Sequence, residues 1–224
     1  MKKLFLMLMI CFLLTGCSNG AGASETDDAV ANSPNPTENV AQTGATIYPL
    51  SDTTMENLSD AILSVSLEEG DAYVDDTGIM QMDVKIYSYD QYDMVDISML
   101  KVGDILVTKG GEVKLESLER TDGAILINGG LDEGGFDLVT DDSGIFYERG
   151  YNDAKNWYEV GEATIRVSVD FMYYDNADLD LGEVVYYPGS FLVGEVTDYH
   201  FVPHNTTIRV ENGQIVEMHR RYVP

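Results

Sequence analysis

Short β-rich runs separated by turn residues recur from Gly70 to the end of the chain, and this pattern constrains the fold more than any other feature. The clearest pair flanks Asn212-Gly213, a dipeptide that favours a type I′ hairpin turn because both central residues need a positive φ. The runs lie at 72–74, 79–88, 105–108, 113–118, 124–128, 136–140, 145–148, 164–169, 184–187, 191–197, 207–210 and 214–219. About eleven short strands with almost no helix predict a mainly β fold, an antiparallel sandwich or barrel.

The run 79–88 also predicts which side chains share a face of their strand, because successive side chains of a strand point to opposite faces. The apolar face would hold Met80, Met82, Val84 and Ile86. The polar face would hold Gln81, Asp83 and Lys85.

The segment before Gly70 has two interpretations. Residues 53–56 fit a capping box, and apolar residues follow at helical spacing as far as Val65, which predicts one short N-terminal helix over 54–64. Leu63, Val65 and Leu67 instead alternate as in a strand. The sequence leaves both readings open.

A short motif occurs twice and raises the question of duplication. Residues 100–104 (LKVGD) and 179–183 (LDLGE) each stand directly before a β-rich run. Two related small β units divided near residues 130–160 would explain the repeat, and so would one β region in which the same turn chemistry recurs.

Residues 1–16 have the layout of a secretory signal peptide. Lys2 and Lys3 precede an apolar run of 11 residues, 4–14, which is shorter than the roughly 20 residues that span a bilayer. The run ends in Leu14-Thr15-Gly16-Cys17, which resembles the lipobox of bacterial lipoproteins. This resemblance covers residues 1–17 and implies that Cys17 carries a diacylglycerol once residues 1–16 are removed. It implies a protein anchored to the cell membrane on the extracytoplasmic face.

The segment 17–46 would then connect the lipid to the folded part. Residues 18–46 contain no aromatic residue and only two large apolar ones, both Val, so they cannot bury enough apolar surface to offset the entropy of ordering. As a flexible chain they would reach about 30 Å. We therefore expect a lipidated, acidic tether at 17–46 and a β-rich folded region at 47–224.

Charge and cysteine content exclude several functions. Removal of Lys2 and Lys3 leaves 11 basic against 39 acidic residues, a formal charge of −28, which makes nucleic acid an improbable partner. Cys11 would leave with the signal peptide, and lipid would block Cys17. The mature chain would then have no free thiol for a disulfide, a nucleophile or a zinc site.

One acidic segment is a candidate calcium site, and no other cofactor is expected. Its residues are Asp175, Asp178, Asp180 and Glu183. The spacing of Asn176, Asp178 and Asp180 is that of an EF-hand start, but Leu181 and Tyr187 occupy the positions where the EF-hand has its Gly and its bidentate Glu. The alternatives are a looser calcium site and a solvated acidic turn.

An aromatic segment is the candidate ligand site. Tyr151, Trp157 and Tyr158 lie in a polar stretch that reads as a loop, where they would stack on a sugar ring or bind a protein; a Trp that plugs the end of a barrel is the alternative. No G-x-S-x-G, H-E-x-x-H or phosphate-loop motif occurs. We therefore expect a non-catalytic binding or interaction module of the cell envelope, with a glycan or protein ligand. The alternative is an envelope hydrolase that acts on glycan or peptide through carboxylates.

Overall fold

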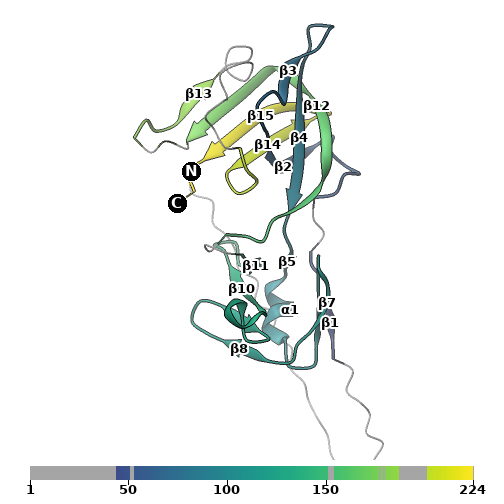
Figure 1. The fold of residues 1–224 in the computed structure, drawn as a ribbon, viewed down its shortest axis with the longest axis vertical. Coiled ribbons are helices and arrows are strands. Elements are labelled where there is room, and N and C mark those ends of the chain that lie inside the picture. The colour runs from purple at the N-terminus through teal and green to yellow at the C-terminus, as the bar shows by residue number, and fades with distance from the viewer. Residues whose placement is uncertain are drawn as a thin grey trace, which may run out of the picture. The chain divides into compact units, whose positions relative to one another are not determined.

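The computed structural model describes residues 44–50, 53–150, 154–176, 178, 180–186 and 201–223. All of them belong to one of the chain's two units, residues 42–224. These residues are mainly β, with fifteen strands in three sheets, one α-helix and one 3₁₀ helix (Figure 1). The predicted β class is confirmed. Neither described helix has the length and apolarity needed to cross a membrane.

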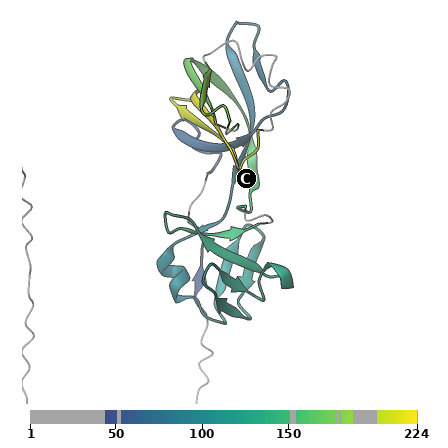
Figure 2. The same ribbon diagram turned by 90° about the vertical axis from the view of Figure 1, so that its left-hand side faces the viewer.

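Five strands close into a barrel. They are β2 (Ala61–Ser66), β4 (Met80–Ser88), β12 (Tyr158–Asn176), β14 (Thr206–Glu211) and β15 (Gln214–Arg221). In the order β12-β15-β14-β2-β4 each strand pairs with the next, and a further pairing of β12 with β4 completes the ring (Figures 1 and 2). Closure leaves these five strands without a free edge along the ring.

The connectivity of the ring identifies its type. Numbered along the chain, the strands follow the order first, second, third, fifth, fourth. All neighbours are antiparallel except the third and fifth, β12 and β15, which are parallel. This order and the single parallel pair are those of the OB-fold, a five-stranded Greek-key barrel.

Strand alternation fills the barrel with apolar side chains. On β4 the predicted alternation is confirmed, because Met82, Val84 and Ile86 are buried whereas Gln81, Asp83 and Lys85 are only half-buried. The core also holds Leu63, Val65, Leu67, Ile165, Val167, Phe171, Tyr173, Phe201, Ile208, Val210, Ile215 and Met218. Two short strands extend the sheet beyond the ring: β3 (Ala72–Val74) on β4 and β13 (Val184–Tyr186) on β12.

The chain between β4 and β12 builds a second core. Its elements are β5 (Gln91–Tyr92), α1 (Met94–Met99), β6 (Ile105–Thr108), β7 (Gly111–Lys114), β8 (Leu118–Arg120), β9 (Ile125–Ile127), η1 (Leu131–Glu133), β10 (Phe136–Thr140) and β11 (Phe146–Arg149). They form the sheet β5-β11-β10-β9-β8 and, with β1 (Thr46–Ile47), the sheet β1-β6-β7. Ser88 and Tyr158, which flank this insertion, are paired in the barrel. The two copies of the repeated motif, at 100–104 and 179–183, directly precede β6 and β13, which belong to different sheets.

The helix forms elsewhere than predicted. Residues 61–66 are strand β2, so the expected helix over 54–64 is wrong and the alternation of Leu63, Val65 and Leu67 was the correct signal. The α-helix is Met94–Met99, where Asp93 acts as N-cap and accepts the backbone N–H of Val95 at 2.7 Å. Pairing with β4 and β14 selects the strand for residues 61–66, because a helix there would leave the ring open.

Candidate functional site on the outer face of β4 and β12

Along β4 and β12, side chains that face the barrel core alternate with polar side chains that lie on the outer face of the barrel. The register of this antiparallel pair sets Gln81 opposite Arg166, Asp83 opposite Thr164, and Lys85 opposite Glu162. Directly opposed side chains of neighbouring strands lie close enough to interact. Each row of this face therefore presents hydrogen-bonding groups from both strands.

A hollow of about 420 Å³ lies on this face. Its polar lining is Asp71, Asp83, Lys85, Glu162 and Thr164, with Val84 and Ala163 beneath. Thr164 Oγ1 donates to Asp83 Oδ1 at 2.6 Å, and the backbone N–H of Asp83 donates to the carbonyl of Asp71 at 2.8 Å. These bonds fix the position of the Asp83 carboxylate in the hollow.

The turn between β3 and β4 borders the same face and is ordered by Asp75. Its carboxylate accepts the Thr77 hydroxyl at 2.6 Å, the Ile79 N–H at 3.0 Å and the Gln81 amide at 2.9 Å. The Thr77 bond above all, then those from Gln81 and Ile79, holds the pKa of Asp75 far below its usual value. Asp75 therefore stays charged and keeps the turn closed at ordinary pH.

Tyr73 on β3 brings an aromatic ring to this face, opposite Gln81 in the register. Burial and the neighbouring carboxylate of Asp83 raise the pKa of Tyr73 above its usual value. The phenol therefore stays protonated and can donate a hydrogen bond. The β14–β15 turn borders the other side of the face, because Gln214 pairs with Arg166.

The chemistry of this face suits a polar, hydroxyl-rich ligand. Carboxylates, hydroxyls and an ammonium alternate over a shallow surface, so both donors and acceptors are offered at short spacing. The polar face predicted for residues 79–88 contains the β4 residues of this outer face. No local pattern indicated the β12 half, because only the pairing with β4 shows which residues of this strand share the face.

The predicted aromatic ligand residues lie elsewhere. Tyr151 lies outside the described residues, and Trp157 and Tyr158 are half-buried at the start of β12. Tyr158 donates to Asp90 Oδ1 at 3.1 Å, and its ring lies 4.9 Å from Lys109 Nζ. Trp157 packs edge-on against Tyr89 with ring centroids 4.7 Å apart. These two rings therefore pack against the chain's own residues.

Lys155 lies among these aromatic rings. Its ammonium lies 4.1 Å from the centre of the Tyr89 ring and 5.0 Å from that of Tyr147, and it donates to the Tyr89 hydroxyl at 2.7 Å. Asp141 Oδ2 is 3.7 Å away. We call Tyr89, Asp141, Tyr147, Lys155 and Trp157 the aromatic–lysine cluster.

The four predicted calcium ligands are not gathered into one site. Asp175 faces the inside of the barrel, where Arg220 binds it, whereas Asp178, Asp180 and Glu183 are exposed. Asp178 caps its own turn by accepting the backbone N–H of Asp180 at 2.9 Å. Asp175 lies on β12 and faces inward, whereas the other three lie between the end of β12 and the start of β13. The described part of the chain holds no group of three or more His, Cys, Asp or Glu suited to a metal ion.

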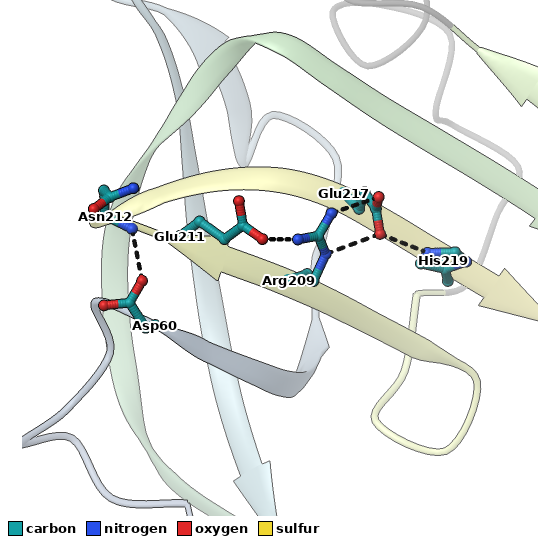
Figure 3. A network of polar contacts seen from close by, with 6 residues as sticks. All are labelled: Asp60, Arg209, Glu211, Asn212, Glu217 and His219. Atoms are coloured by element: carbon teal, nitrogen blue, oxygen red, sulfur yellow. Dashed lines mark hydrogen bonds and ion pairs between the residues drawn. The ribbon is translucent and has the colours of Figure 1, made fainter.

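A network of charged residues covers the outer face of the β14–β15 hairpin (Figure 3). Arg209 binds Glu217 through two hydrogen bonds, of 3.0 and 2.6 Å, and also pairs with Glu211. Glu217 Oε2 lies 3.4 Å from His219 Nε2, and the His219 ring stacks on Tyr174 with centroids 4.6 Å apart. These charged side chains pair with one another on the surface of the hairpin. We therefore interpret the network as structural.

Comparisons with protein-family models, with curated proteins and with solved structures found no match for this chain. Cys17, the predicted lipidation site, lies outside the described residues.

Proposed function

We propose that this chain is a lipid-anchored protein of the cell envelope that binds a glycan, without catalysis, on the outer face of β4 and β12. The observation that carries the proposal is the polar hollow of this face on a closed barrel, bordered on both sides by turns. OB-fold barrels that bind oligosaccharides use the face of the same two strands, the second and third. The fold supports the proposal by analogy, and the side chains in the hollow supply the chemistry for binding.

The charges favour a glycan over the other ligands that such barrels bind. Nucleic acid is disfavoured because the mature chain would carry a formal charge of −28. The hollow offers the acceptors Asp71, Asp83 and Glu162 beside the donor Lys85. The Thr164 hydroxyl donates to Asp83 and can still accept a hydrogen bond. Sugar hydroxyls donate and accept in turn, so such a mixture can satisfy several of them at once.

The location in the envelope rests on the lipobox-like end of the signal segment. If Cys17 carries the lipid, Cys17→Ala should move the protein from the membrane fraction of the producing cells to the soluble fraction. A variant of a nearby tether residue, Ser18→Ala, serves as the control and should stay in the membrane fraction. Equal membrane retention of both variants would contradict the lipid anchor.

Calorimetric titration of the purified protein with soluble peptidoglycan fragments and with neutral glucans, xylans and mannans tests the binding proposal. Glu162→Gln removes one charge from the hollow, and Glu211→Gln removes the same charge from an exposed strand position on β14. We expect Glu162→Gln to weaken binding about tenfold, as expected for loss of one charge-assisted hydrogen bond, and Glu211→Gln to leave it unchanged. An equal effect of both variants, or no binding to any glycan, would refute the site.

Incubation of the protein with the same glycans distinguishes binding from hydrolysis. A binding module leaves the glycan intact, so the concentration of reducing ends should stay constant over hours. Turnover that Asp83→Asn or Glu162→Gln abolishes would replace the binding module with an envelope hydrolase that works through these carboxylates.

A further inference from the structure

The aromatic–lysine cluster holds a cation on the faces of aromatic rings. Lys155 Nζ lies 4.1 Å from the centre of the Tyr89 ring and 5.0 Å from that of Tyr147. Both distances are within the roughly 6 Å over which a ring face attracts a cation. Asp141 adds a carboxylate 3.7 Å from the same ammonium. Two rings and one carboxylate therefore surround a single positive charge.

The backbone builds this arrangement from three separate segments. The pairing of β11 with β5 sets Tyr147 opposite Gln91, two residues after Tyr89. An isolated bridge between Arg149 and Lys155 folds the segment after β11 back along that strand. The rings are thus fixed by strand pairing, whereas the cation is carried on a flexible four-carbon side chain that is 27% exposed.

Trp157 supports the rings and leaves one polar atom unused. It packs edge-on against Tyr89, with the ring planes at 72°. Its Nε1 is buried and is the one buried side-chain nitrogen or oxygen that lacks a hydrogen-bond partner among the residues that the structure describes. A buried donor without an acceptor costs free energy, so packing alone does not explain why a Trp occupies this position.

We propose that Tyr89, Tyr147 and Asp141 form a recognition site for alkylammonium groups, which Lys155 occupies in the structure described here and which a ligand ammonium enters when Lys155 withdraws. Aromatic rings that surround a cation are the usual means of recognising quaternary ammonium ions. The strong negative charge of the chain would also concentrate cations near it. This site is separate from the glycan face and does not depend on it.

Removal of the resident ammonium tests the proposal. Lys155→Met removes the charge and shortens the unbranched side chain by one atom, which leaves the rings open to an added cation. Trp157 is the single tryptophan of the chain and contacts Tyr89, so its fluorescence reports on the site. We expect tetramethylammonium to change the fluorescence of Lys155→Met saturably and to bind about tenfold more weakly to the wild type, in which Lys155 competes.

Two controls complete the experiment. The uncharged analogue 3,3-dimethylbutan-1-ol should give no saturable change, and Tyr147→Leu introduced into Lys155→Met should abolish the response to tetramethylammonium. Thermal melting of each variant verifies that it is folded, and the exposed substitution Lys101→Met serves as a matched loss of one positive charge. The proposal is overturned if Lys155→Met shows no saturable response, if the uncharged analogue acts equally well, or if Lys101→Met responds as Lys155→Met does.

Discussion

Arg220 on β15 and Asp175 on β12 form a buried, bidentate ion pair inside the barrel. Arg220 Nε lies 3.0 Å from Asp175 Oδ1 and Nη2 lies 2.6 Å from Oδ2, and the two side chains are 5% and 8% exposed. The Tyr173 hydroxyl donates to Asp175 Oδ2 at 2.9 Å. The pair connects the two parallel strands of the ring, the third and the fifth, at positions that face each other in the register.

Asp175→Ala should destabilise the protein strongly. It removes two hydrogen bonds from a buried guanidinium, and loss of one partner of a buried pair costs about 3–5 kcal/mol. The free energy of unfolding in urea measures the loss. Asp180→Ala, an exposed acid of the same segment, should change it by less than about 0.5 kcal/mol. A similarly small effect of Asp175→Ala would contradict the importance of the pair.

Calcium should not change the thermal stability of the protein. A ligand that binds only the native state raises the melting temperature, but Asp175 is held by Arg220 and the three exposed acids do not converge with it. Melting in millimolar calcium and in chelator should give the same temperature. A rise in calcium that Asp178→Asn abolishes would restore the calcium site proposed from the sequence.

Gly135→Ala should destabilise the second core. A Cβ at this position would lie 1.9 Å from the carbonyl oxygen of Ile127 and 2.6 Å from that of Asn128, so the backbone before β10 would have to move. Such overpacking costs roughly 1–3 kcal/mol. Gly123→Ala is the matched control, because nothing lies within 4 Å of its Cβ. Urea unfolding should show a loss for Gly135→Ala and almost none for Gly123→Ala.

The ion pair of Glu217 with Arg209 should contribute to stability only above acidic pH. The hydrogen bond from Arg209 lowers the pKa of Glu217, so the native state favours the charged form. The contribution is therefore fully present above the unfolded pKa of about 4.3 and is lost as the pH falls through the depressed pKa of the native state. Because both side chains are partly exposed, we expect this contribution to be small and to be weakened by salt.

The difference between the free energies of unfolding in urea of the wild type and of Glu217→Gln measures the contribution of this ion pair. It should be present at pH 7, smaller at high salt, and reduced at pH 3. Glu119→Gln, which changes an exposed acid on β8, should show little difference from the wild type at either pH. A difference for Glu217→Gln that is as large at pH 3 as at pH 7 would contradict the ionic origin.

Local patterns predicted many strands correctly. The alternation in residues 79–88 predicted β4 and its two faces, and Asn212-Gly213 predicted the turn between β14 and β15, where Asn212 and Gly213 both have positive φ. The helix over 54–64 failed because helical and strand spacing overlap in a short apolar segment. Pairing with two neighbouring strands then decided the outcome. The predicted run 191–197 lies outside the described residues.

The candidate site was only half visible in the sequence. Gln81, Asp83 and Lys85 were expected on one face of their strand, but Glu162, Thr164 and Arg166 join them from a strand about eighty residues later, across the insertion. For the same reason, the carboxylate of Asp175 could not be assigned to Arg220 from spacing. Trp157 was predicted to bind a ligand from its polar segment alone, and that segment did not reveal its contact with Tyr89, which lies 68 residues earlier in the chain.

The β-rich class, the hairpins and the alternation of buried and polar residues follow from local patterns, because they depend on turn chemistry and on a period of two within each strand. Three outcomes appear only in the folded chain: five strands close into a ring, a second core is inserted between β4 and β12, and certain acids such as Asp175 face inward. Those outcomes depend on which distant strands pair and in which register. Shifting a register by one residue would exchange the two faces of a strand, and the local sequence does not encode its partner.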